Sequence, residues 1–218
     1  MEEYYYILQK NPLFKEADNS DIRSMLDCLD AKMVSIKKGE YVVIEGEAMK
    51  SIGIVLSGGL QVVKDDSEGI RTILAGIGPS DIFGEAVCCA GMEQSPVSVV
   101  ANEVSDVLLL DFKRILNVCS NTCTFHLKLI ENMLYVLAQK NLFLQNRMDI
   151  TSKKRVREKI LMYLDSLGAA VGKIVDVPLN REQMAEYLCV ERSALSHELM
   201  RMKKDGIIDY HKNSFKLL

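Results

Sequence analysis

Five polar side chains recur along one face of a helix predicted near the C-terminus. They are Arg192, Ser193, Ser196, His197 and Arg201. A guanidinium donates two parallel hydrogen bonds to neighbouring acceptors, whereas hydroxyl and imidazole groups both donate and accept. The base edges in the major groove of DNA present such a pattern of donors and acceptors. Arg192 can therefore pair with a guanine edge or a phosphate, and the two serines and the histidine have the polarity and reach for bases.

The residues around these side chains are typical of a winged helix-turn-helix. The predicted elements are a short helix at residues 181–188 capped by Asn180, a turn at 189–191, a second helix at 192–204 and a two-stranded wing at 207–210 and 213–217. Ala185 lies where two steeply crossing helices need a small side chain, and Gly206 ends the second helix. In this geometry the N-terminal part of the second helix enters the major groove.

Further basic residues surround the predicted motif and are better placed for phosphates. They are Arg181, Lys203, Lys204, His211, Lys212 and Lys216. Residues 1–120 carry 11 Lys and Arg against 19 Asp and Glu, a net charge of −8, whereas residues 121–218 carry 16 against 11, a net charge of +5. A basic C-terminal part on an acidic protein indicates contact with a polyanion. The competing interpretation of each single lysine is a solvated surface charge.

The region from residue 32 to residue 110 predicts short antiparallel strands. Its β-branched runs lie at residues 42–44, 52–56, 60–63, 70–74, 97–100 and 107–110. Glycines such as Gly39, Gly46 and Gly69 separate the runs, as turns do between strands. The pattern predicts an antiparallel barrel or roll.

A long predicted helix, residues 121–149, carries a seam whose members alternate in steps of three and four. The seam consists of Leu127, Ile130, Leu134, Leu137, Asn141, Leu144 and Met148. A single Asn at such a position favours a parallel two-stranded coiled coil, because the two amides bond only in register. About 28 helical residues would extend roughly 42 Å, which is awkward to bury inside one small domain. We expect a homodimer; the alternative is an amphipathic helix packed on its own domain.

These elements predict an α+β chain in three parts. An N-terminal β-roll with flanking helices occupies residues 1–120, a dimerisation helix 121–149, and a winged helix-turn-helix domain 150–218. Asp149, Thr151 and Ser152 are candidate caps for a new helix at residues 153–167, so we expect a hinge at 149–153.

Composition excludes several classes of protein. The start of the chain lacks a basic segment, and no run of 18 or more apolar residues occurs, so neither a signal peptide nor a membrane span is predicted and the expected location is cytoplasmic. The six cysteines show no CxxC pattern, and we predict no metal site and no cofactor. The sequence holds three histidines and no P-loop, GxSxG or HExxH motif, so we expect no enzyme.

The order of roll, long helix and winged helix resembles the family of the cyclic AMP receptor protein and FNR, which are bacterial transcription regulators. The segments that carry the resemblance are Asn11-Pro12-Leu13-Phe14, Lys38-Gly39-Glu40, Glu45-Gly46-Glu47, Leu56-Ser57-Gly58-Gly59, Phe83-Gly84-Glu85 and the eight residues 192–199. The resemblance implies an effector pocket in the roll, bordered by the long helix of the opposite subunit. Its residues would be Gly84, Glu85, Cys88, Ser95, Lys140 and Asn141.

Departures from the family pattern bear on the effector. Cyclic-nucleotide-binding members hold the phosphate with an arginine followed by serine or threonine, where this chain has Ser95 and Pro96, and no Lys or Arg occurs from Glu85 through Asn102. Burying an anion without a counter-charge is costly, so we predict an unidentified small molecule other than cyclic AMP. Only Cys28 lies in the first 80 residues, which argues against the FNR iron-sulfur cluster, and a haem would need a ligand such as His126.

The function we expect is a homodimeric, sequence-specific regulator that binds an inverted repeat of double-stranded DNA, and RNA polymerase if it activates. His197 stands where many relatives have arginine, so the operator of a relative does not transfer. One alternative is a thiol-responsive regulator that uses Cys88, Cys89, Cys119 or Cys123. The other is a ligand-binding module whose winged helix serves protein contacts.

Overall fold

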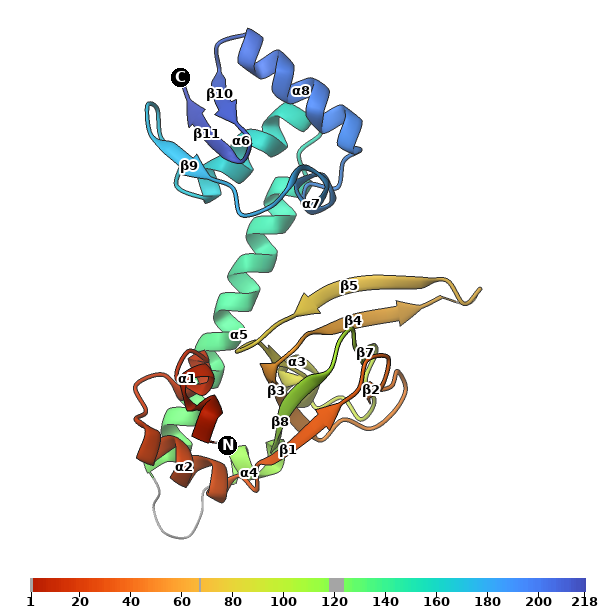
Figure 1. Ribbon diagram of the computed structural model, residues 1–218, viewed down its shortest axis with the longest axis vertical. Helices are drawn as coiled ribbons and strands as arrows, with labels where there is room; N and C mark the ends of the chain where they lie inside the picture. Colours follow the sequence, from red (N-terminus) through yellow and green to blue (C-terminus); the bar gives the residue numbers. More distant parts are fainter. Residues whose placement is uncertain (1, 67, 118–123) are drawn as a thin grey trace. The chain divides into compact units, whose positions relative to one another are not determined.

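The computed structural model describes residues 2–66, 68–117 and 124–218 (Figure 1). The chain forms two compact units, residues 1–138 and 139–218. The predicted α+β class is confirmed: an antiparallel roll, a long helix and a winged helix-turn-helix follow one another along the chain. The long helix α5, Thr124–Thr151, runs through the boundary between the two units.

The first unit begins with short helices that cap the roll. They are η1 (Glu2–Tyr4), α1 (Tyr5–Leu8), η2 (Pro12–Phe14) and α2 (Asn19–Cys28). Asp18 and Asp21 form a capping box at the start of α2, since each carboxylate accepts from the other residue's backbone N–H. This fixes the start of the helix.

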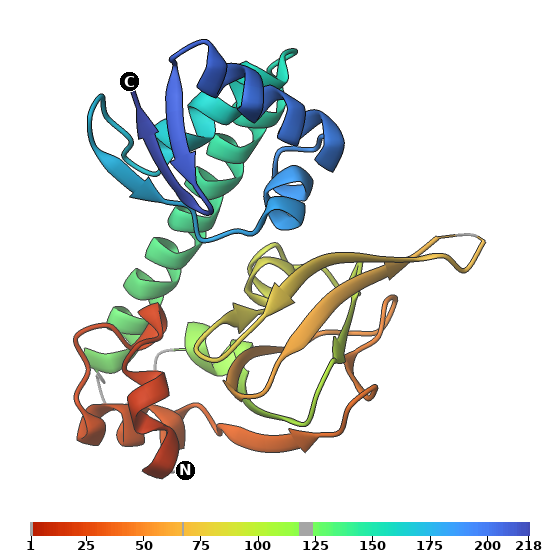
Figure 2. The ribbon, with the colours of Figure 1, turned by 45° about the horizontal axis from the view of Figure 1, so that its top comes forward.

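Two four-stranded antiparallel sheets form the roll (Figure 2). One has the order β1 (Lys32–Ile36), β8 (Ser105–Asp111), β3 (Ser51–Ser57), β6 (Ile82–Phe83), and the other β2 (Tyr41–Val43), β7 (Ser98–Ala101), β4 (Leu60–Asp65), β5 (Arg71–Ile77). Strand β3 is buried on both faces from Ile52 to Leu56, and these five residues carry no polar side chain. Ile52 and Ile54 belong to the core shared with the helices, and Val55 to the core of the roll itself.

Gly53 on β3 lies where no side chain fits. A Cβ at this position would lie 2.0 Å from the ring of Phe83 on β6. Glycine is thus required here by the close approach of a neighbouring aromatic ring rather than by its backbone angles.

Three helices follow within or after the strands: α3 (Glu85–Cys89), α4 (Phe112–Leu116) and α5. The first half of α5 packs into the core that the N-terminal helices share with the roll, through Leu129, Met133 and Val136, all at most 5% exposed. Asn132 lies on the same face and donates to the carbonyls of Leu13 (2.9 Å) and Lys15 (3.2 Å). Part of α5 therefore does pack on its own domain, as the alternative interpretation of this helix expected, while other residues of α5 stay exposed.

The second unit comprises the end of α5 and a winged helix-turn-helix. Its further elements are α6 (Val156–Ser166), β9 (Ile174–Asp176), α7 (Arg181–Tyr187), α8 (Arg192–Lys204), β10 (Ile208–His211) and β11 (Ser214–Leu217). The strands form one antiparallel sheet in the order β10, β11, β9. Ile160, Leu199 and Phe215 join α6, α8 and the wing in a single core.

The predicted helix start near residue 153 is wrong. Helix α5 continues to Thr151, whose hydroxyl donates to the Arg147 carbonyl (2.8 Å) instead of capping a new helix, and α6 begins only at Val156. A threonine inside a helix can bond back to the preceding turn in this way. Across the described ranges 2–66, 68–117 and 124–218, no helix is both long and apolar enough to cross a membrane.

Candidate nucleic-acid interface and effector region

Local sequence determines the helix-turn-helix. Asn180 caps α7 by accepting from the backbone N–H of Gln183 (2.9 Å), and the Gln183 side chain accepts from the Asn180 N–H (2.9 Å). The turn between the helices passes through Cys189, whose φ is +51°. A side chain with a Cβ rarely adopts this left-handed conformation, in which glycine is free of strain.

Helix α8 separates an apolar face from a polar one. Leu195, Leu199 and Met202 are at most 1% exposed and face the core of the unit. The predicted base-reading residues Arg192, Ser193, His197 and Arg201 are exposed, whereas Ser196 is half-buried and its hydroxyl donates to the Arg192 carbonyl (2.9 Å). The structure brings four polar side chains together on the outer face of one helix.

Two of the predicted phosphate contacts are engaged within the protein. The Arg181 guanidinium lies over the rings of Tyr210 (5.2 Å) and Phe215 (4.9 Å) and donates to the Lys212 carbonyl (2.6 Å). Partial burial lowers the pKa of Arg181. Lys203 forms an ion pair with Asp209 (2.6 Å) that raises the pKa of the lysine.

The other predicted phosphate contacts are open to solvent in different degrees. Lys204, His211 and Lys212 are exposed, the last two at the turn of the wing, and Lys216 on β11 is half-buried. The exposed residues of this group are the better candidates for phosphate.

Helix α6 supplies two contacts that the sequence did not indicate. Lys159, only 9% exposed, donates from Nζ to the carbonyls of Leu188 (2.9 Å) and Cys189 (3.3 Å). Arg157 donates from Nε to Glu198 (2.5 Å) and from Nη2 to Asp205 (2.8 Å). Both side chains read as ordinary surface charges in the sequence, because their partners lie 29 to 48 residues away.

In the roll, Gly84, Glu85 and Cys88 come together at the start of α3. Gly84 has a φ of +81°, and a Cβ there would lie 1.9 Å from the methyl of Met49. Glu85 and Cys88 are buried. Burial raises the pKa of the Cys88 thiol to about 11, so very little thiolate forms near neutral pH.

Ser95 lies in a separate turn and serves that turn. It is 3% exposed, its hydroxyl donates to the Val97 carbonyl (2.7 Å), and its N–H donates to the Glu47 carbonyl (2.9 Å). A shallow depression of about 480 Å³ lies beside it, lined by Glu45, Gly46, Met92, Glu93, Gln94, Ser95 and Pro96. Two carboxylates and no cation are among these lining residues, so the depression does not favour an anion.

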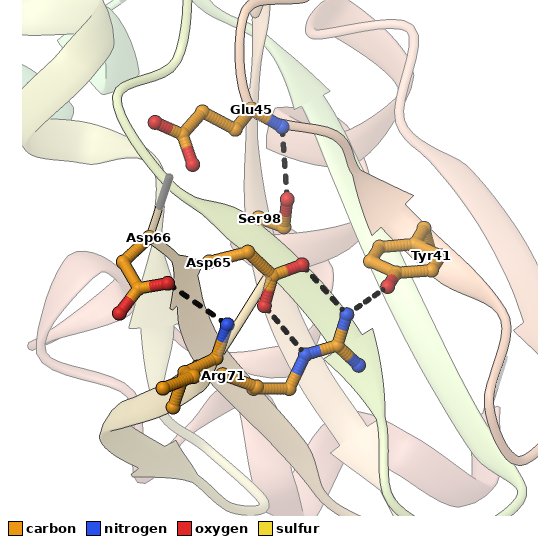
Figure 3. A network of polar contacts seen from close by, with 7 residues as sticks. Tyr41, Glu45, Asp65, Asp66, Arg71 and Ser98 are labelled. Atoms are coloured by element: carbon orange, nitrogen blue, oxygen red, sulfur yellow. Dashed lines mark hydrogen bonds and ion pairs between the residues drawn. The ribbon is translucent and has the colours of Figure 1, made fainter. Parts of the chain in front are cut away.

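The arginine that precedes this region in sequence is already neutralised (Figure 3). Arg71 donates to both carboxylate oxygens of Asp65 (2.9 Å each) and to the Tyr41 hydroxyl (2.6 Å). This bidentate pair raises the pKa of Arg71. No Lys or Arg stands between Arg71 and Lys113 in the sequence, and two nitrogens of the Arg71 guanidinium are already bound to Asp65.

The remaining predicted residues lie on α5 or are cysteines. Lys140 and Asn141 are exposed, as are Leu127 (65%), Leu134 (63%), Leu144 (56%) and Met148 (69%), whereas Ile130 and Leu137 are half-buried. Cys89 is exposed, and its pKa is raised, chiefly by partial burial. Cys119 and Cys123 lie outside the described residues.

His126, the haem ligand that the sequence offered, is 2% exposed. Its Nε2 lies 3.0 Å from the Arg114 carbonyl oxygen and 3.8 Å from Cys28 Sγ. The Nε2 nitrogen is thus engaged with a backbone carbonyl inside the protein, which fits a packing role better than iron ligation. No cluster of three or more His, Cys, Asp or Glu suited to a metal occurs within the described parts of the chain.

Comparisons with known proteins agree with both units. A family model described as a cyclic nucleotide-binding domain matches residues 33–122, and one described as a Crp-like helix-turn-helix domain matches residues 155–218. The transcriptional activator protein FnrA of Stutzerimonas stutzeri is 24% identical over 191 residues, which cover 84% of this chain and 75% of the relative.

Solved structures show the same fold over nearly the whole chain. DNR from Pseudomonas aeruginosa has a TM-score of 0.53 and 21% identity, covering 100% of this chain and 95% of that one. The catabolite activator protein of Thermus thermophilus has a TM-score of 0.51 and 18% identity, covering 95% and 94%.

Proposed function

We propose a function for this chain from one premise: it belongs to the Crp/Fnr family and is therefore a DNA-binding transcription regulator with a sensor domain of the cyclic-nucleotide-binding type. The proposal is that it acts as a homodimer on an inverted-repeat operator, in the cytoplasm and without catalytic activity. An effector other than cyclic AMP controls it. If it activates transcription, it also contacts RNA polymerase.

The outer face of α8 is the observation that carries the proposal. Arg192, Ser193 and His197 are exposed near the N-terminal end of the helix, where a recognition helix contacts bases. Arg192 has the fork geometry for a guanine edge. Arg201, Lys204 and Lys212 are exposed cations suited to phosphates, which fix the register of the protein on the duplex.

The homodimer rests on the seam of α5. Leu127, Leu134 and Met148 are each more than 60% exposed, and large apolar side chains at a regular spacing on a long helix need a cover. A second copy of the same helix supplies matching residues, with Asn141 setting the register. Two recognition helices should then reach half-sites about 34 Å apart, one turn of DNA.

Control by the effector is a population shift. A ligand that binds one arrangement of the dimer more tightly than another favours that arrangement by its difference in affinity. The acidic lining beside Ser95 and the pairing of Arg71 with Asp65 support an effector that is neutral or cationic. Lys140 and Asn141 remain candidate contacts from the long helix.

The thiol-responsive alternative receives little support at Cys88, because burial keeps that thiol protonated. Cys89 is exposed and remains its better candidate. A comparison of operator affinity in reductant and in mild oxidant separates the two, since a regulator without a thiol switch is unaffected.

Selection of binding sites from random duplex DNA tests the proposal. The intact protein should enrich an inverted repeat, and its affinity for that repeat should fall steeply with salt as phosphate contacts release counterions. Enrichment of a site without two-fold symmetry would contradict the dimer. If the protein binds no DNA even at low salt, the result would instead favour the alternative of a ligand-binding module whose winged helix contacts protein.

A further inference from the structure

We propose that α6 is the element that holds the DNA-reading helix in position, through Lys159 and Arg157. Lys159 clamps the turn before α8, and Arg157 fixes α8 itself at two points. Both are positioning residues that contact protein rather than DNA. The inference rests on the proposed function, because it assigns roles within the same DNA-reading surface.

The Lys159 ammonium occupies the point where the chain turns from α7 into α8. Its two acceptors, the carbonyls of Leu188 and Cys189, belong to the end of α7, where unpaired carbonyls carry partial negative charge. A buried lysine is rare unless it is paired in this way. The ammonium thus satisfies the carbonyl of the C-cap residue Leu188 and the carbonyl of the residue that follows it.

The backbone at this point needs support. Cys189 has a φ of +51°, a conformation that persists in a residue with a Cβ only when its surroundings hold it. Lys159 bonds the carbonyl of that residue directly (3.3 Å). Removing the ammonium would leave the Leu188 and Cys189 carbonyls without this donor and would free the turn to relax, which changes where α8 begins.

Arg157 acts on α8 beyond the turn. Its guanidinium bonds Glu198 in the middle of the helix and Asp205 at its C-cap, seven positions apart and so about 10 Å along the axis. Two contacts at that separation restrict both the tilt and the rotation of α8. Glu198 directly follows the exposed His197, so a rotation of the helix would move the imidazole out of line with a base.

The contacts also limit what Glu198 can do. Its side chain is only 16% exposed and is bound by Arg157, so it is not available to accept from a cytosine amino group. Base reading then falls to Arg192, Ser193 and His197. Lys159 and Arg157 count toward the basic charge of residues 121–218, yet their donors are used by protein acceptors.

The test compares operator affinity with non-specific affinity in the intact protein. Lys159→Met removes the ammonium, Lys159→Arg keeps donors at the site, and Lys154→Met removes one exposed lysine of the same unit as the matched control. Each variant is titrated with the operator selected by the wild type and with an unrelated duplex of equal length, over a range of salt concentrations.

We expect Lys159→Met to weaken operator binding about 10-fold or more, while its affinity for the unrelated duplex and its salt dependence match those of Lys154→Met. Lys159→Arg should restore operator affinity to within about 3-fold of the wild type. A general loss of folded protein would lower both affinities together. If Lys159→Met and Lys154→Met keep the same ratio of operator to non-specific affinity, the proposal is overturned.

Arg157→Met gives an independent reading should Lys159→Met fail to fold. The Arg157 side chain is 33% exposed, whereas Lys159 is buried, so we expect this variant to fold and to show the same selective loss, about 5-fold or more. An unchanged ratio in this variant also overturns the proposal. If the wild type itself selects no operator, the proposed function fails. If the wild type distinguishes its operator from unrelated DNA and the variants do so equally well, only the positioning role of α6 fails.

Discussion

The two units of this chain place their polar side chains in opposite ways. On α8 of the winged unit, Arg192 and His197 extend into solvent with apolar residues behind them. At the start of α3 in the roll, Glu85 and Cys88 are buried, and Ser95 bonds within its own turn. A surface that meets DNA must present its donors outward, so its function can be read from the residues. A small-molecule site is made of enclosed groups, and its ligand is constrained chiefly by charge.

The two units also differ in the charge of their exposed side chains. The winged unit offers exposed cations such as Arg201 and Lys204, whereas the depression beside Ser95 carries Glu45 and Glu93. The residues that line this depression thus offer no counter-charge to a cyclic phosphate. The comparison predicts strong, salt-dependent anion binding in one unit and none in the depression of the other.

The largest effect is expected when the two recognition helices of the dimer are separated from each other. Leu134→Asp places a charge on the α5 seam, and we expect the protein to become monomeric and to lose about 100-fold or more in operator affinity, since each half-site then binds alone. Sedimentation velocity and operator titration measure both effects. Leu142→Asp is the control, because Leu142 is similarly exposed (58% against 63%) but lies outside the seam. A Leu134→Asp protein that stays dimeric would refute the seam.

Within the winged unit, substitutions of base-contacting residues and of phosphate-contacting residues should affect DNA affinity in different ways. Arg192→Ala should cost about 1–3 kcal/mol, roughly 5- to 150-fold, at one base position and relax specificity there. Lys204→Ala should weaken binding to all sequences alike and reduce the salt slope by about 1. Titrations against single-base variants of the operator measure both. Equal losses on operator and unrelated DNA for Arg192→Ala would exclude a base contact.

In the roll, packing should dominate over surface chemistry. Gly53→Ala forces a methyl against the Phe83 ring and should destabilise the first unit by about 1–3 kcal/mol through overpacking. Gly76→Ala on β5 is the matched control, because no atom lies within 4 Å of its added Cβ. Calorimetry gives the unfolding temperatures of the two variants. Similar temperatures would contradict the prediction, because they would show that the Gly53 site can accommodate a methyl group without loss of stability.

The two adjacent cysteines should react at different rates. With a pKa of about 11, roughly one Cys88 thiol in a thousand is ionised at about pH 8. Because the thiolate is the reactive form, the reactivity of Cys88 should rise with pH up to about pH 11. Cys89 is exposed and should be alkylated first by iodoacetamide. Peptide mass spectrometry follows each site, with Cys88→Ala as the control. Faster labelling of Cys88 would indicate an opening of α3.

Cyclic AMP should have the smallest effect of all. A ligand at 100 times its dissociation constant stabilises a protein by about 2.7 kcal/mol, which shifts the unfolding temperature by several degrees. We expect no measurable shift with cyclic AMP, because the lining beside Ser95 holds two carboxylates. A clear shift would mean that Arg71 or another cation is released to meet the phosphate.

The parts of this fold that depend on local signals were predictable. Helix α8 begins at Arg192 and ends before Gly206 as expected, and Asn180 caps α7 through Gln183. Strands β1, β6 and β9 were missed. β1 is exposed or half-exposed along its length, and the other two have three residues or fewer, so none shows an alternating pattern.

What the sequence could not reveal are partners distant along the chain. Lys159 and Arg157 look like solvated charges until α6 is packed against α7 and α8. Arg181 looked like a phosphate contact, yet two aromatic rings of the wing lie beneath its guanidinium. Asn132 is 5% exposed and donates to two backbone carbonyls that lie 119 and 117 residues away. Each of these depends on tertiary contacts rather than on spacing.

The stoichiometry of the protein on DNA tests the central claim most directly. Sedimentation of the intact protein with one selected inverted-repeat duplex should give two chains per duplex, and a duplex with only one half-site should bind far more weakly. One chain bound per inverted repeat, with the same affinity for the single half-site, would contradict the account.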